Sequence, residues 1–161
     1  MLAYSKNNFY LSEFLIFIPP KFKKMNTKTI VAAVLSAVVT FLLGWLIYGI
    51  LLMNYFDSHM MHYPGLMKAQ PDFLYIGLAN LAWGLLTAYI LQIAGITTVS
   101  KGLITGAIVS CLSTAGYDLI MFAQFNLSSR TADIVDVAAS TVLGAVSGAV
   151  IGWWYGRGKT A

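Results

Sequence analysis

The chain has 161 residues, of which 58% are hydrophobic and 10% are charged, whereas soluble domains average roughly 45–50% and about 25%. A soluble protein of this length could not bury so many apolar side chains, so the composition predicts a single-domain integral membrane protein. The formal net charge of +4 comes from basic residues at the ends of apolar segments, which argues against a nucleic-acid partner and indicates the lipid bilayer as the partner.

The first 24 residues differ in kind from the rest of the chain. Residues 14–18 are apolar, but Pro19-Pro20 ends any helix there and no small-residue cleavage site follows, so this is not the pattern of a signal peptide. Met25 comes directly before a long apolar segment, and we expect translation to begin there. The alternative is a leader, 1–24, that lies on the membrane surface with its aromatic side chains on lipid. The membrane domain is then 25–161.

Four apolar segments reach the length of about 20 residues that a helix needs to cross a bilayer. A lone helix satisfies its own backbone hydrogen bonds in lipid and a lone strand does not, so the fold class is all-α. The predicted spans are residues 29–55, 73–95, 102–125 and 134–155, with a polar loop over 54–72. The other connections are short and imply antiparallel neighbours, so we expect an up-down-up-down four-helix bundle.

Lysine and arginine are concentrated on one side of the predicted spans. Lys28 precedes the first span, Lys101 lies in the second connection and Arg157 follows the fourth span, whereas the other side of the sequence has only Lys68 and Arg130. Loops rich in basic residues stay in the cytoplasm, so both termini are predicted to be cytoplasmic. We expect a multi-pass protein of a bacterial cytoplasmic membrane.

The loop after the first span contains side chains that bind soft copper(I), which prefers thioether and imidazole ligands. These side chains are His59, Met60, Met61 and His62. Their spacing matches no established site, and the alternative is an interfacial loop whose methionines rest on lipid. We therefore predict no metal and no cofactor, with copper at these four residues as the less favoured alternative.

Small residues recur every four positions in the last two spans. Positions four apart share a helix face, and a face of small residues lets helices in lipid approach closely. The predicted packing residues are Gly102, Gly106, Ser110, Gly144, Gly148 and Gly152. Continued in steps of four, the first row reaches Asp118 and the second begins at Asp136.

Asp118 is the leading candidate for a functional group within the membrane. A carboxylate at a helix centre costs about 2.5–3.5 kcal/mol on insertion scales, so it should face the bundle or a wet cavity. The candidate proton or ion site comprises Asp118, Asp136, Asn80, Tyr117 and Ser140. We expect the two aspartates at different depths, with Ser140 nearer the level of Asp118.

Each of these residues also has a purely structural interpretation. Asp118 is then a carboxyl held by hydrogen bonds, and Asp136 is a carboxylate near the start of a helix, where the helix dipole favours it. Asn80 is then a residue that forms hydrogen bonds between helices. The sequence leaves both interpretations open.

Two functions follow, and neither is enzymatic. No phosphate-binding loop or nucleophile elbow is present in the sequence, and no histidine lies inside a predicted span. The favoured function is a structural or accessory bundle without a substrate, with self-association left open. The alternative is a small ion- or proton-coupled transporter or channel that uses Asp118. The interrupted helices typical of transporter sites are not predicted, because no proline lies inside a span.

The segment Phe41-Leu42-Leu43-Gly44-Trp45-Leu46-Ile47-Tyr48 ends the first span. It resembles the start of a family of small bacterial four-span membrane proteins listed as a domain of unknown function (number seventeen sixty-one). Length, span count and the glycine-rich last span fit over residues 27–156, whereas Gly49-Ile50 replaces the Ser-Pro expected after the tyrosine. The resemblance implies a compact bacterial membrane protein and supplies no catalytic residue, because the family has no assigned activity.

Overall fold

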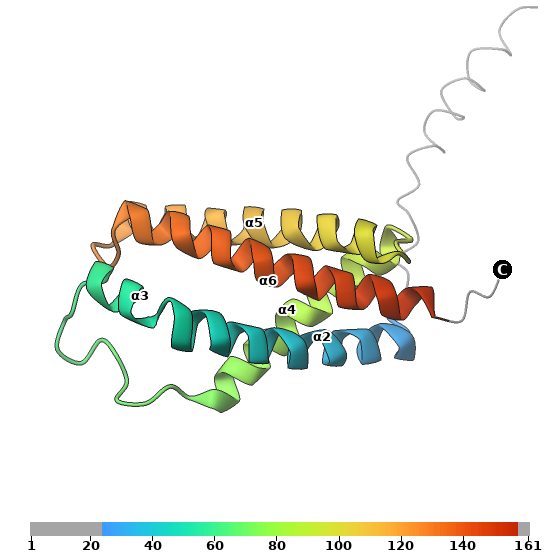
Figure 1. Ribbon diagram of the computed structural model, residues 1–161, viewed down its shortest axis with the longest axis horizontal. Helices are drawn as coiled ribbons and strands as arrows, with labels where there is room; N and C mark the ends of the chain where they lie inside the picture. Colours follow the sequence, from blue (N-terminus) through green and yellow to red (C-terminus); the bar gives the residue numbers. More distant parts are fainter. Residues whose placement is uncertain (1–23, 158–161) are drawn as a thin grey trace, which may run out of the picture.

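The computed structural model describes residues 24–157, and four long helices pack together in them (Figure 1). Helix α2 spans Thr27–Leu46 and continues through the π-helical turn η1, Ile47–Leu51. The other long helices are α4, Phe73–Ile93, α5, Val99–Gln124, and α6, Arg130–Gly156. Each has the length and apolar composition to cross a membrane. The prediction of an all-α protein with four long apolar helices packed together is confirmed, whereas the predicted leader lies outside the described residues.

A short helix, α3 over Met53–His59, occupies the start of the segment that we predicted as a polar loop. The Phe56 ring stacks on Tyr48 with centroids 5.6 Å apart. The chain beyond α3 pairs with the α5–α6 connection, where the Met61 N–H donates to the Leu127 carbonyl at 2.9 Å. The loop prediction was wrong here because contacts with distant residues hold a segment whose local composition is polar.

Helix α6 begins at Arg130, four residues before the predicted start at 134. The Ser129 hydroxyl caps the helix by accepting from the Ala132 N–H at 3.2 Å, and Asp133 lies in the first turn, where the helix dipole favours a carboxylate. Hydropathy marks only the apolar part of a span. A capped polar first turn therefore escaped the prediction.

The helices form two pairs that meet through α6. Helices α5 and α6 run side by side, α2 pairs with α4, and α2 also packs on α6 (Figure 1). The buried residues of α4 all lie in its second half, and they are Gly84, Thr87, Ala88, Leu91 and Gln92. The first half of α4 therefore has no comparable partner among the described helices.

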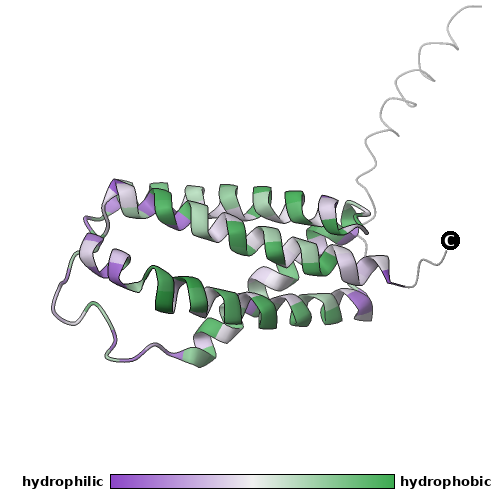
Figure 2. Cartoon of the chain, viewed as in Figure 1, coloured by the Kyte–Doolittle hydropathy of each residue, from purple (hydrophilic) through white to green (hydrophobic). Residues whose placement is uncertain are grey.

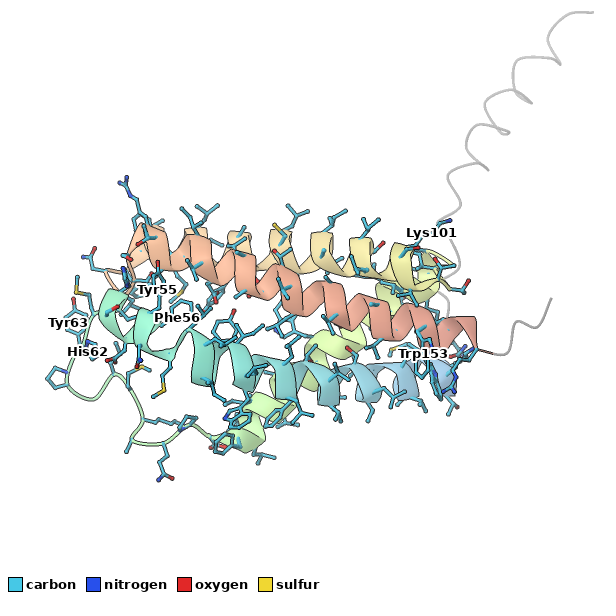
Figure 3. All side chains as sticks on the ribbon, in the orientation of Figure 1. Tyr55, Phe56, His62, Tyr63, Lys101 and Trp153 are labelled. Atoms are coloured by element: carbon cyan, nitrogen blue, oxygen red, sulfur yellow. The ribbon has the colours of Figure 1, made fainter. Side chains whose placement is uncertain are left out.

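The two ends of the molecule differ in chemistry. Apolar residues cover the middle of the helices and polar residues gather at their ends (Figure 2). Trp153 and Lys101 lie at one end, which we call the Trp153 end, and Tyr55 and Tyr63 lie at the other, the Tyr55 end (Figure 3). The Trp153 end combines the starts of α2 and α5 with the end of α6, as the hydrogen bond from the Lys28 ammonium to the Arg157 carbonyl illustrates.

Small side chains build the core near the Trp153 end. Ala32, Ala33 and Ala88 are completely buried. A Cβ on Gly84 would lie 2.7 Å from the Ala33 carbonyl oxygen, so the backbones of α2 and α4 are in direct contact. Lipid provides no hydrophobic force between helices, and such close packing is what holds membrane helices together.

Candidate functional site

The two rows of small residues lie face to face along α5 and α6. A Cβ on Gly106 would lie 2.1 Å from the Gly144 carbonyl oxygen, and one on Gly148 would lie 2.0 Å from the Gly102 carbonyl oxygen. A Cβ on Gly152 would lie 2.4 Å from the Thr98 carbonyl oxygen. Substituents at these positions would displace backbone rather than a flexible side chain.

This contact sets the register of the two helices. Gly106 lies between the levels of Gly144 and Gly148, and one turn further the Ser110 hydroxyl donates to the Ser140 carbonyl at 2.7 Å. The same register places Asp136 one turn, about 5.4 Å, beyond Ser140 toward the Tyr55 end. Asp118 lies two turns beyond Ser110, so our expectation that Ser140 would be nearest to its level was wrong.

The side chains of Asp118 and Asp136 nevertheless point toward each other. In an α-helix the Cα–Cβ bond tilts toward the helix N-terminus, so Asp118 leans toward the Trp153 end and Asp136 leans toward the Tyr55 end. The two carboxyl groups are neighbours across the contact between α5 and α6. The antiparallel helices thus direct these two side chains toward each other even though their backbone positions are not level.

Tyr48 brings the first helix to this pair. Its hydroxyl donates to Asp136 Oδ1 at 2.6 Å and lies 3.0 Å from the Ser140 hydroxyl. Tyr48 belongs to η1, where the Leu52 N–H donates to the Ile47 carbonyl at 2.8 Å in the wide π-helical pattern. Such turns are frequent at functional sites. We call Tyr48, Asp118, Asp136 and Ser140 the carboxyl cluster.

Sequence reasoning left Tyr48 out of the predicted site. The available signal was its place in a four-residue row of polar and small residues on the first span, namely Ser36, Thr40, Gly44 and Tyr48. Ser36, in the same row, meets Ser147 with hydroxyl oxygens 2.6 Å apart in the core. The row marks the face of α2 that contacts α6.

One atom of the carboxyl cluster has no partner. Asp118 Oδ2 is buried and forms no hydrogen bond within the described residues. The side chain of Asp118 also lines an open groove of about 460 Å³ on the α5–α6 pair, together with Arg130 and Asp133. An unpaired buried carboxyl oxygen beside an open groove can take up a proton or a small cation without breaking an existing contact.

Asn80 and Tyr117 do not belong to the cluster. The Asn80 side chain donates to the Ile76 carbonyl of its own helix at 2.9 Å, and no hydrogen bond in the described chain joins it to Asp118. Tyr117 is 63% exposed. It directly precedes Asp118, so its side chain leaves the helix about 100° away from that of Asp118. The structure does not bring these two predicted site residues to Asp118, because α4 diverges from α5 here and neighbouring helical residues point in different directions.

The candidate copper ligands are divided among separate contacts. The His59 ring stacks on Tyr55 with centroids 4.2 Å apart, and His62 Nε2 lies 3.0 Å from Asp57 Oδ1. The side chains of Met60 and Met61 are exposed. In residues 24–157 no three His, Cys, Asp or Glu side chains are grouped to bind a metal.

A second buried polar contact lies near the Trp153 end and was not predicted. The Thr29 hydroxyl donates to Gln92 Oε1, and Gln92 Nε2 donates to the Lys24 carbonyl at 3.0 Å. Both Thr29 and Gln92 are buried. Their signal in the sequence was a lone amide near the end of an apolar span, where lipid would leave it without a partner.

No family model, curated protein or solved structure matches this chain. The resemblance to the four-span family therefore stays a prediction from the sequence. What the structure supports is an integral membrane protein with four candidate membrane-spanning helices.

Proposed function

We propose that this protein is a structural or accessory component of a bacterial cytoplasmic membrane, acting through helix contacts rather than by moving a solute or catalysing a reaction. The observation that carries this proposal is the backbone-to-backbone packing at the Trp153 end. Gly102 and Gly148 touch through their backbones, and so do Gly84 and Ala33. A path through the bundle would have to separate these contacts.

An accessory role also needs a surface that can meet another membrane component. The first half of α4 exposes large apolar side chains, and among these are Phe73, Leu74, Tyr75 and Trp83. These side chains contact lipid, or another helix, without any change in the fold. Self-association through this surface is part of the same proposal.

Reconstitution into liposomes tests the proposal. We expect vesicles that contain the purified protein to conduct H⁺, Na⁺ and K⁺ no faster than empty vesicles when a gradient or voltage is imposed, because backbone contacts join the helices near the Trp153 end. The measurement is the fluorescence of an internal pH or cation indicator. Protein-dependent flux would contradict the proposal.

The second candidate is a small proton- or ion-coupled transporter or channel, favoured by the unpartnered Asp118 Oδ2 atom. Under this candidate, Asp118→Asn abolishes any flux that the wild-type protein shows. Asp133→Asn is the control, because Asp133 lines the same groove but its Oδ1 already accepts from the Ser128 hydroxyl at 2.6 Å. Flux that survives Asp118→Asn excludes Asp118 as the coupling group.

Stability gives an independent prediction for Asp118. Asparagine has nearly the same shape and removes a charge that is costly to bury, so Asp118→Asn should leave the midpoint of thermal unfolding in detergent unchanged or raise it. A clear decrease would mean that the carboxyl group is an essential structural link. Asp57→Asn, at an exposed position, serves as the control for a change of charge alone.

Orientation is a further part of the proposal. The basic side chains of Lys28, Lys101 and Arg157 support a cytoplasmic Trp153 end and cytoplasmic termini. A reporter that functions only in the cytoplasm should therefore be active when it is fused after Ala161. A reporter that functions only outside should be active when it is inserted at Lys68. The opposite pattern would overturn the assigned orientation.

A further inference from the structure

The start of α2 and the end of α6 border an open groove of about 510 Å³ at the Trp153 end. It is lined by Thr27, Lys28, Val31, Trp154 and Arg157. Lys28 and Arg157 provide two positive charges, and Val31 and Trp154 provide apolar surface. We propose that this groove binds the headgroup of one anionic phospholipid, with an acyl chain extending along α2.

The positive charges in the groove are held in place. The Lys28 ammonium donates to the Tyr155 carbonyl at 3.0 Å and to the Arg157 carbonyl at 2.7 Å, at the C-terminus of α6. An ammonium has three donors, so one N–H remains for a ligand. The Trp154 indole donates to the Lys28 carbonyl at 3.1 Å and ties the two helices together from the other side. The groove walls are thus fixed before any ligand binds.

Arg157 supplies the second cation. Its guanidinium lies 4.2 Å from the centroid of the Trp153 ring and 5.8 Å from that of Trp154. Stacking on indole orients the guanidinium and leaves its N–H groups free at the edge, in the planar arrangement that suits phosphate. No carboxylate within residues 24–157 forms an ion pair with Arg157. The groove therefore has a charge that the described protein does not neutralise.

The location selects a lipid rather than a soluble anion. Trp153, labelled in Figure 3, and Trp154 lie at the end of a membrane helix, where tryptophan marks the boundary between headgroups and acyl chains. Below the cations, α2 presents an exposed apolar stripe that runs toward the membrane interior and consists of Ile30, Val34, Val38 and Leu42. Basic pockets between membrane helices at this level are typical sites for anionic headgroups.

Native mass spectrometry of the detergent-purified chain tests the proposal. The protein is titrated with phosphatidylglycerol, which carries one negative charge, and separately with phosphatidylcholine of the same acyl chains. We expect one bound phosphatidylglycerol with at least about fivefold higher affinity than phosphatidylcholine, because a basic residue near an anionic surface contributes about 1 kcal/mol.

Arg157→Gln should reduce the affinity for phosphatidylglycerol about fivefold and leave that for phosphatidylcholine unchanged. Lys101→Gln is the matched control, because Lys101 is an exposed cation at the same end of the molecule but does not line the groove (Figure 3). Equal losses in both variants, or no loss in Arg157→Gln, would overturn the proposal. The thermal unfolding midpoint of each variant establishes that binding is compared between folded proteins.

Competition with inorganic phosphate tests whether the groove binds the phosphate of a lipid headgroup or free phosphate. Added in large excess over the lipid, it should not displace phosphatidylglycerol, because it cannot occupy the apolar wall formed by Val31 and Trp154. Complete displacement would show that the groove recognises free phosphate, and the assignment to a lipid would then be wrong.

Discussion

We expect Gly148→Ala to lower the free energy of unfolding in detergent by about 3 kcal/mol, at the upper end of the usual cost of overpacking. The added Cβ would lie 2.0 Å from the Gly102 carbonyl oxygen and 3.0 Å from the Gly106 Cα. Neither atom can rotate away, so α5 and α6 must separate. The separation weakens the neighbouring glycine contacts and the hydrogen bond from Ser110 to the Ser140 carbonyl.

Gly116→Ala is the matched control on α5. A Cβ there meets no atom within 4 Å. Alanine is also a better helix former than glycine by about 0.8–1.0 kcal/mol, so this variant should be neutral or slightly more stable. Reversible unfolding in mixed micelles measures both variants. Equal effects at Gly148 and Gly116 would show that the row of small residues is not the contact between α5 and α6.

Tyr48→Phe should destabilise the protein by about 1.5–3 kcal/mol, the range for a hydrogen bond to a charged group. The substitution keeps the aromatic ring and its stacking on Phe56 but removes the hydroxyl that donates to Asp136 Oδ1 at 2.6 Å. It also deprives the Ser140 hydroxyl of its partner at 3.0 Å. No other donor from α2 or η1 to Asp136 is present in the described residues.

A double-mutant cycle attributes this loss to the proposed contact. Tyr48→Phe should cost much less in an Asp136→Ala background, because the acceptor is already absent. Tyr117→Phe is the control, since Tyr117 is 63% exposed. We expect its free energy of unfolding to stay within about 0.5 kcal/mol of the wild-type value. Full additivity in the cycle would mean that the Tyr48 hydroxyl stabilises the fold through some other group.

The sequence predicted the members of the carboxyl cluster on α5 and α6 better than it predicted their relative depths. Steps of four residues identify Asp118, Asp136 and Ser140 as belonging to two facing rows, since that spacing is a property of any α-helix. Their relative depths depended on where each helix begins. The polar first turn of α6, capped by Ser129, was invisible to hydropathy, and the inferred levels were therefore displaced.

Asn80 was among the predicted site residues but lies apart from the carboxyl cluster, whereas Tyr48 was not among them but belongs to it. Asn80 seemed suited to the cluster because a polar residue in lipid needs a partner, yet it finds one in its own helix at the Ile76 carbonyl. Tyr48 was not among the predicted site residues, although it lies in the four-residue row of small and polar residues on the first span. It reaches Asp136 because α2 packs on α6 and continues into a π-helical turn at that position.

The sequence by itself determined that the chain has four helices long and apolar enough to cross a membrane, and that small residues lie on their contact faces. These are consequences of composition and of the 3.6-residue helical period, which are local properties. Only the tertiary structure decided which faces meet, that α3 replaces the expected loop, and that Tyr48, Asp118, Asp136 and Ser140 converge. The contact between Tyr48 and Asp136 joins residues 88 positions apart, and it depends on helix packing that no local pattern encodes.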